Sequence, residues 1–141
     1  KKSCPYEACL GVPLLIRMPG APHRTERAIV SAVDIAPTIA ELSSASIPMA
    51  FDGVSLVPLL TTGSRDELPG EVFAEWVGDQ AIPAWWEIRT RRFAYIELGT
   101  GERELYALRD DPYELVNVVD APAFEGDVSR LAAALEAYRS V

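Results

Sequence analysis

The sequence predicts an α+β fold: one or two sheet strands with helices, followed by a small antiparallel sheet and a C-terminal helix. Three observations predict it. Residues 12–18 form a nearly continuous apolar run, which is typical of a strand buried on both faces. Several short apolar segments separated by turn residues follow residue 71 and favour antiparallel strands. The last segment carries apolar residues at helical spacing, namely Val128, Leu131, Leu135 and Tyr138.

The first half of the chain predicts one strand and one or two helices. The apolar run at 12–18 ends at a Pro-Gly pair and has no partner strand in the residues that follow, so it would need neighbours that this chain need not supply. Asp34 is the expected N-cap of a helix that reaches about Ser44. Its apolar face is predicted from the helical spacing of Ile35, Ile39 and Leu42.

A turn and a polar loop separate this helix from the second half. Asp52 and Gly53 predict a turn, residues 54–60 a short helical or extended segment, and residues 61–70 a loop. We therefore expect two parts: residues 1–65, the edge of an α/β sheet domain, and residues 66–141, a smaller α+β subdomain.

The second half predicts strands near residues 72–77, 84–90, 93–98 and 105–108. The sequence Gly-Thr-Gly at 99–101 separates the last two and indicates a hairpin. Asp127 is the expected cap of the final helix. A sheet of this kind, covered by one helix, forms a compact α+β layer.

The overall charge excludes some partners. The chain has 13 Lys and Arg against 21 Asp and Glu, a net charge of −8, which argues against nucleic acid because phosphates require a basic surface. No apolar run approaches the about 18 residues of a membrane helix, so we expect no membrane partner. The N-terminal residues do not resemble a secretory signal, although a mature or excised chain would look the same. The localisation stays open.

The two cysteines, Cys4 and Cys9, lie five residues apart. A disulfide is possible where the segment is irregular, but free thiols are the favoured interpretation because spacing alone does not fix the geometry. A zinc site would need more ligands than His23, the only histidine, can add. His23 lies in a loop, and we expect its side chain to face solvent.

Two further groups invite a functional interpretation that the sequence does not favour. The acidic residues Asp110, Asp111 and Glu114 could form a metal cluster, but Asp-Pro at 111–112 is typical of a turn, so we expect a capping role. The tryptophans could border a substrate cleft, but packing is the favoured role for all three: Trp76, Trp85 and Trp86.

Five ordered blocks resemble the C-terminal region of the sulfatases of the alkaline-phosphatase superfamily. Lys2, Tyr6 and Glu7 match K-x-x-x-Y-E, and residues 12–14 and 19–20 match the V-P-L and P-G that follow. The other four blocks are S-A-V-D-I-A-P-T-I-A-E-L at 31–42, D-G-V-S-L-V-P-L-L at 52–60, R-T-R-R-F-A-Y-I at 89–96 and E-L-Y-A-L-R-D-D-P-Y-E-L-V-N at 104–117.

The blocks extend from residue 2 to about 117, and each is weak by itself, whereas the ordered set is specific. The sequence departs from the family pattern at Ala8, Ala94 and Ala107, where the family carries Glu, Lys and Asp. Those positions are structural in the family, so the departures concern surface contacts more than chemistry.

The resemblance implies an alkaline-phosphatase-like α/β parent that hydrolyses sulfuric esters. Such enzymes use a formylglycine made from the Cys of C-x-P-x-R and a divalent cation, usually calcium, because charge develops on the sulfuryl oxygens. Neither Cys4 nor Cys9 stands in that motif, so formylglycine and calcium are expected in a region that this chain lacks. We therefore expect no metal ligand and no nucleophile here.

Lys2 is the one catalytic and substrate-binding residue that the resemblance assigns to this chain. It falls where the family carries a lysine that contacts the sulfate, and Lys1 is the alternative register. We expect the chain to be inert alone and to act with the N-terminal catalytic region of the same protein on a sulfate ester. The alternatives are part of a phosphonate or phosphodiester hydrolase, or a stand-alone interaction module in which residues 12–18 are paired or covered.

Overall fold

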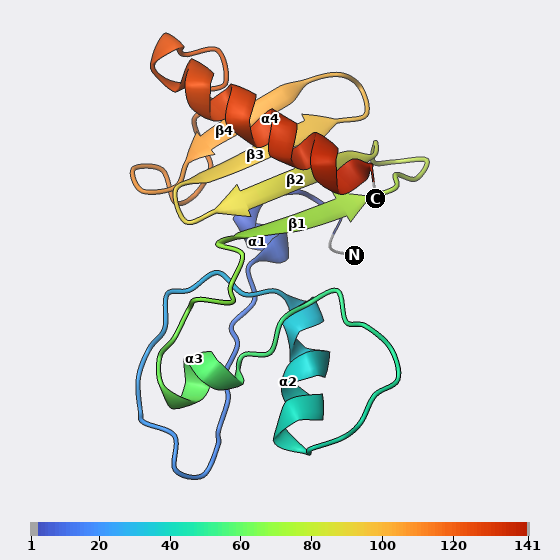
Figure 1. Ribbon diagram of the computed structural model, residues 1–141. Helices are drawn as coiled ribbons and strands as arrows, with labels where there is room; N and C mark the ends of the chain where they lie inside the picture. Colours follow the sequence, from blue (N-terminus) through green and yellow to red (C-terminus); the bar gives the residue numbers. More distant parts are fainter. Residues whose placement is uncertain (1–2, 141) are drawn as a thin grey trace. The chain divides into compact units, whose positions relative to one another are not determined.

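The computed structural model of the protein describes residues 3–140 (Figure 1). They divide into two compact units, one formed by the segment up to Pro13 together with the chain from Glu71 onward, the other by residues 14–70. The sequence placed the division between residues 65 and 66 and assigned the N-terminal segment to the first part. In the structure, the N-terminal segment up to Pro13 belongs to the same unit as the residues from Glu71 onward. It does so because it is anchored on the sheet described next.

The first unit is built on a four-stranded antiparallel sheet in the order β1-β2-β3-β4. Its strands are β1 (Glu71–Trp76), β2 (Trp85–Thr90), β3 (Phe93–Leu98) and β4 (Arg103–Ala107). Along the sheet, Ile88 pairs with Tyr95, and Tyr95 pairs with Leu105. The predicted α+β fold is confirmed, and the four predicted strands coincide with the observed ones to within about two residues at each end.

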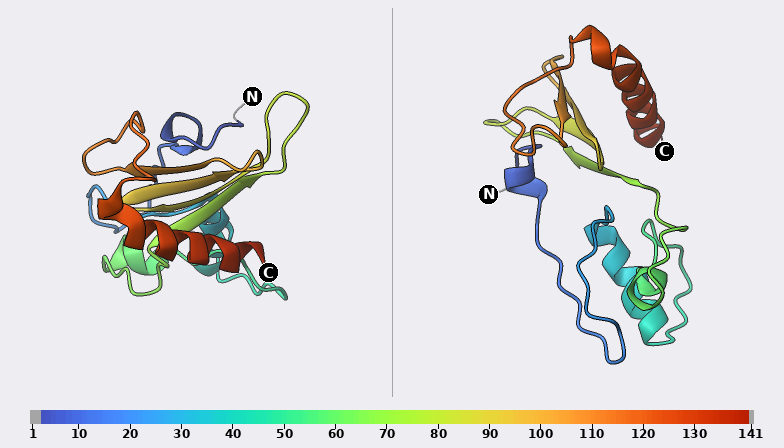
Figure 2. Two further views of the ribbon diagram at one scale, coloured as in Figure 1. Left: turned by 90° about the horizontal axis from the view of Figure 1, so that it is seen from above. Right: turned by 90° about the vertical axis from the view of Figure 1, so that its left-hand side faces the viewer.

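Helix α4 (Glu125–Arg139) covers one face of this sheet and follows a short 3-10 turn, η2 (Pro122–Phe124) (Figure 2). Val128, Leu131 and Leu135 pack there against a cluster of buried strand residues: Ile88, Phe93, Tyr95 and Leu105. Tyr138, predicted on the same apolar stripe, stays 41% exposed, and its ring stacks on Phe73. The helix begins two residues before Asp127, so the predicted cap is wrong; Phe124 occupies the N-cap position.

The loop after β4 explains why the block at 104–117 is rich in turn-forming polar residues. The Asn117 side chain accepts hydrogen bonds from the backbone N–H groups of Leu105 and Val119 and donates one to the Arg103 carbonyl. The Asp111 carboxylate accepts from the N–H groups of Leu115 and Val116, which confirms its predicted capping role. These side chains fix the path of the loop beside β4.

The second unit contains η1 (Ala32–Asp34), α2 (Ile35–Leu42) and α3 (Val57–Thr61). Asp34 accepts hydrogen bonds from the N–H groups of Ser31 and Val54, both between 2.8 and 2.9 Å long. Thr38 accepts from the N–H of Leu56. Gly53 passes so close to the Val33 carbonyl that a Cβ atom would lie 2.4 Å from its oxygen, which explains the glycine at this position.

The predicted buried strand at 12–18 does not form in this chain, since residues 11–18, all described, have neither helix nor strand structure. Leu15 is 88% exposed. Among the described residues, the only sheet consists of β1 to β4, so no strand pairs with the backbone of this segment. The predicted apolar face of α2 is likewise exposed: Ile39 is 60% accessible, and the buried residues of α2 are Pro37 and Thr38. Within residues 3–140, no helix has the length and apolarity needed to cross a membrane.

Candidate functional site

Lys2, the predicted site residue, lies outside the described residues, and so does its alternative Lys1. The residues that follow Lys2 lie on the face of the sheet opposite α4 and include helix α1 (Glu7–Leu10) (Figure 2). Ser3 is only 4% exposed, and its carbonyl accepts a 2.9 Å hydrogen bond from the indole Nε1 of Trp85. The chain immediately after Lys2 is therefore fixed to strand β2.

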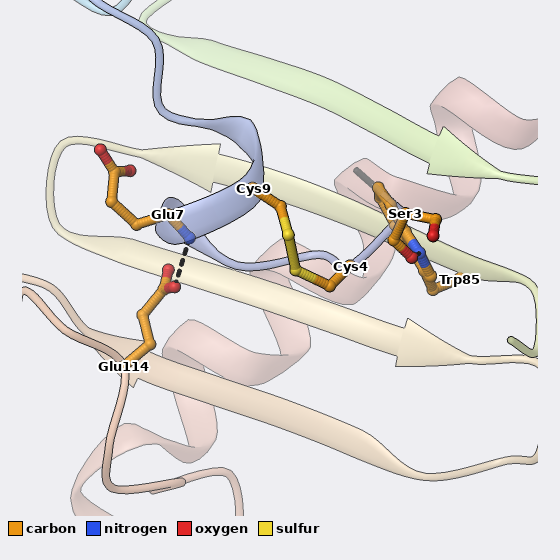
Figure 3. The surroundings of a disulfide bond; sticks show 6 residues. All are labelled: Ser3, Cys4, Glu7, Cys9, Trp85 and Glu114. Carbon is orange, nitrogen blue, oxygen red and sulfur yellow. Dashed lines mark hydrogen bonds between the residues drawn. A yellow bond between two sulfur atoms is a disulfide. The ribbon is translucent and has the colours of Figure 1, made fainter. Parts of the chain in front are cut away.

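Cys4 and Cys9 form a disulfide, so the interpretation as free thiols is wrong (Figure 3). Helix α1 turns the chain back on itself: the N–H of Cys9 donates to the carbonyl of Tyr6 at 2.8 Å. The two Cα atoms then lie 5.8 Å apart, within the usual range for a disulfide. A cysteine in a disulfide has no free thiol to be converted to formylglycine, in agreement with the absence of C-x-P-x-R around either residue.

Tyr6 attaches the middle of this segment to strand β4. Its ring meets Tyr106 edge to face with 6.2 Å between centroids, and both hydroxyls donate to the carboxylate of Glu104. Burial, together with the neighbouring Glu104, raises the pKa of both phenols. Both tyrosines are therefore neutral hydrogen-bond donors at physiological pH.

A charged cluster centred on Arg89 attaches the end of the segment. The guanidinium contacts the carboxylates of Glu87 at 2.9 Å and Glu7 at 3.1 Å, and it also pairs with Glu114. Glu114 in turn accepts a 2.6 Å hydrogen bond from the backbone N–H of Glu7 (Figure 3). The side chains of Glu87 and Glu114 are each 1% exposed. One partly buried cation thus binds three carboxylates from three parts of the chain.

Burial sets the protonation of this cluster. It raises the pKa of Glu87 to about 7, an effect that Arg89 opposes and that Glu114 and Glu7 increase. Between about pH 4.5 and 7, the native state therefore holds a proton on Glu87 that an unfolded chain would release.

This proton predicts a pH dependence of stability. The pKa of Glu87 is higher in the native state than the about 4.3 of an unfolded glutamate, so the native state binds more protons between these values. The free energy of unfolding should fall as pH rises from about 4.5 through 7, by an amount of the order of 3 kcal/mol.

Glu87→Gln should flatten this decline, whereas Glu136→Gln, at a side chain that is 74% exposed, should leave it unchanged. Urea unfolding at a series of pH values measures how the free energy of unfolding changes with pH. A Glu87→Gln protein with the same slope as the unmodified chain would contradict the assignment.

The remaining candidates have structural roles. His23 is exposed, and Trp86 lies beneath the guanidinium of Arg139 at 4.1 Å, which agrees with the packing role predicted for the tryptophans. Among residues 3–140, no group of three or more His, Cys, Asp or Glu side chains is arranged to hold a metal ion. Residues 3–140 therefore present no such cluster for the calcium ion that the resemblance implies.

Comparison with solved structures defines the fold. The phosphonate monoester hydrolase from Silicibacter pomeroyi matches 88% of this chain with a TM-score of 0.72 and 27% identity, and the match covers 28% of that enzyme. The sheet, α4 and the anchored N-terminal segment thus form a C-terminal α+β region of the kind found in alkaline-phosphatase-like hydrolases.

Sequence comparison identifies the family. The family described as N-sulphoglucosamine sulphohydrolase, C-terminal, matches residues 1–140. Arylsulfatase K of Gallus gallus is 34% identical over 123 residues, which are 80% of this chain and 23% of the relative. Choline-sulfatase of Rhizobium meliloti (strain 1021) is 30% identical over 131 residues, 91% of this chain and 25% of the relative. The chain belongs to the sulfatase family and corresponds to the C-terminal region of its members. It spans about a quarter of the length of these relatives.

Proposed function

We propose that this chain is the C-terminal part of a sulfuric ester hydrolase and that Lys2 contacts the sulfate group of the substrate. The family match over residues 1–140 carries the first part of the proposal. Lys2 is proposed because its spacing before Tyr6 and Glu7 resembles K-x-x-x-Y-E. An ammonium group is suited to the role because it is a compact charge with three hydrogen-bond donors. Developing negative charge on sulfuryl oxygens is stabilised by such a fixed cation.

The nucleophile and the divalent cation are proposed to come from an N-terminal catalytic region of the same protein. Two observations support this division. Cys4 and Cys9 are joined in a disulfide, and the described residues present no metal-binding group. When present, formylglycine and calcium would supply the attack on sulfur and the neutralisation of its oxygens. The chain by itself is expected to be inactive.

The exposed apolar residues of the second unit support the same partner. Leu14, Leu15 and Ile16 follow one another in an extended segment without strand partners, and α2 exposes Ile35, Ile39 and Leu42. Burial of such side chains stabilises by about 1.5–3 kcal/mol each. We propose that the N-terminal region covers them, with residues 12–18 completing a sheet there. The rival interpretation, a stand-alone module, required residues 12–18 to be paired or covered within this chain.

A second candidate function is the hydrolysis of phosphonate or phosphate esters. The likeness to the phosphonate monoester hydrolase of Silicibacter pomeroyi favours it, since that match covers 88% of the chain. Sulfate and phosphonate monoesters both present anionic tetrahedral oxygens to a lysine. The matched curated relatives with sulfatase names favour the sulfuric ester.

An assay of the full-length protein separates these candidates. We expect hydrolysis of 4-nitrophenyl sulfate to exceed that of 4-nitrophenyl phenylphosphonate, measured as kcat/KM, because the matched curated relatives are sulfatases. The isolated 141-residue chain, tested at the same concentration, should release no 4-nitrophenol from either compound. A preference for the phosphonate would favour the second candidate. Turnover by the isolated chain would contradict the proposed division of the site.

A further inference from the structure

We propose that Trp85 and the Cys4–Cys9 disulfide are positioning residues: they hold the segment that carries Lys2 and thereby fix where its ammonium group can reach. This inference rests on the proposed function, because it assumes that Lys2 contacts the sulfate. It assigns a positioning role to residues for which the sequence favoured packing or free thiols. Trp85 lies 82 positions from Ser3 in the sequence.

The first part of the argument is the anchor at Ser3. Its carbonyl accepts from the indole of Trp85, which is itself 3% exposed and packs with Ala94, Ile96 and Tyr106. Consecutive Cα atoms are about 3.8 Å apart across a trans peptide. Whatever fixes Ser3 therefore fixes the point from which the backbone of Lys2 starts.

The second part is the anchor at Glu7. The backbone N–H of this residue donates to the buried carboxylate of Glu114 (Figure 3). Its own carboxylate pairs with Arg89. Glu114 lies 107 positions away in the sequence, and Arg89 belongs to strand β2. Both ends of the short segment are thus attached to the same sheet.

The disulfide joins these two anchors. Helix α1 has four residues, too few to be stable by itself. The bond between Cys4 and Cys9 closes the chain around the start of α1, so that Ser3 and Glu7 move together. Because its sequence separation is only 5, closing this loop restricts the unfolded chain less than a long loop would. Its strongest effect is expected on the local segment.

Such rigidity matters for a lysine. The side chain has a flexible stem, so a site can place its charge only if the backbone beneath it is fixed. A displacement of about 1 Å can cost about a hundredfold in rate. The anchors at Ser3 and Glu7 hold the backbone that follows Lys2.

The test is a double-mutant cycle in the full-length enzyme with 4-nitrophenyl sulfate. Trp85→Phe retains an aromatic ring and removes the indole N–H that donates to the Ser3 carbonyl. We expect it to lower kcat/KM by about ten- to a hundredfold when Lys2 is present. In the Lys2→Ala background, it should lower kcat/KM no further, because a positioning residue acts through the lysine. Equal losses in both backgrounds, or no loss in either, would overturn the inference.

Two controls accompany the cycle. Trp86→Phe changes the neighbouring tryptophan, on the α4 face of the same strand, and should lower kcat/KM by less than twofold with Lys2 present. Cys4→Ser combined with Cys9→Ser should repeat the Lys2-dependent loss, and dithiothreitol should reproduce it in the unmodified enzyme but not in this variant. If both oxidised and reduced enzymes have the same kcat/KM, the disulfide has no positioning role.

The cycle also separates this inference from the proposed function. If Lys2→Ala leaves the rate unchanged, the proposed contact with sulfate fails, and positioning of Lys2 for that contact fails with it. If Lys2→Ala lowers the rate and the Trp85 loss is the same in both backgrounds, only the inference fails.

Discussion

Replacing Lys2 with alanine in the full-length enzyme is expected to lower kcat for a sulfate ester by about 10²- to 10³-fold, the loss seen when one donor to a developing oxyanion is removed. The physical reason is that charge develops on the sulfuryl oxygens in the transition state, so an ammonium group held there stabilises the transition state more than the bound substrate. Steady-state kinetics with 4-nitrophenyl sulfate measure kcat and KM. The loss of activity should appear mainly as a lower kcat.

Lys1→Ala is the matched control, because Lys1 is a neighbouring lysine of the same charge and length. It should retain nearly the full rate. The opposite result, a large loss at Lys1 and none at Lys2, would move the site by one residue. Unchanged turnover in both variants would remove this segment from the active site.

Replacing Arg89 with alanine is expected to destabilise the chain by about 3–5 kcal/mol, the usual cost of leaving buried charges without their partner. Its guanidinium is the one that contacts Glu7, Glu87 and Glu114 together, and two of those side chains are 1% exposed. The loss would also remove the ion pair that holds Glu7 to strand β2. Urea unfolding at neutral pH, followed by tryptophan fluorescence, measures the change.

Arg92→Ala serves as the control, since Arg92 is exposed and lies over the ring of Phe93 at 4.9 Å. Its effect should be below about 1 kcal/mol. Adding Glu87→Gln to Arg89→Ala should recover lost stability only above about pH 7, where Glu87 would otherwise become an unpaired buried carboxylate. An Arg89→Ala protein as stable as Arg92→Ala would show that solvent reaches the cluster and screens its charges.

The sequence alone was informative where structure depends on local patterns. The short apolar segments after residue 71 predicted all four strands, and Gly99 to Gly101 predicted the hairpin, because apolar runs and turn chemistry are read from neighbouring residues. The helical spacing of Val128, Leu131 and Leu135 predicted the face on which α4 packs. The ordered blocks predicted the sulfatase family, which the family match over residues 1–140 confirms.

Patterns that need a partner were less informative. Residues 12–18 have the composition of a buried strand, but a strand requires neighbours for its N–H and C=O groups, and the described chain supplies none. The apolar stripe of α2 predicted a buried face that is exposed here for the same reason. An apolar composition indicates that a segment is buried in the complete protein. It does not show which residues cover that segment.

Long-range pairings could be found only in the tertiary structure. Nothing local connects Ser3 with Trp85 or Glu7 with Glu114, since each pair is brought together by the sheet and the loop after β4. The disulfide was misjudged because spacing does not fix the Cα separation, and the turn of α1 does. The sequence by itself determined the family and the strands after residue 71, and it proposed the candidate lysine. The tertiary structure decided how the segment after that lysine is held, because burial and charge pairing act through space.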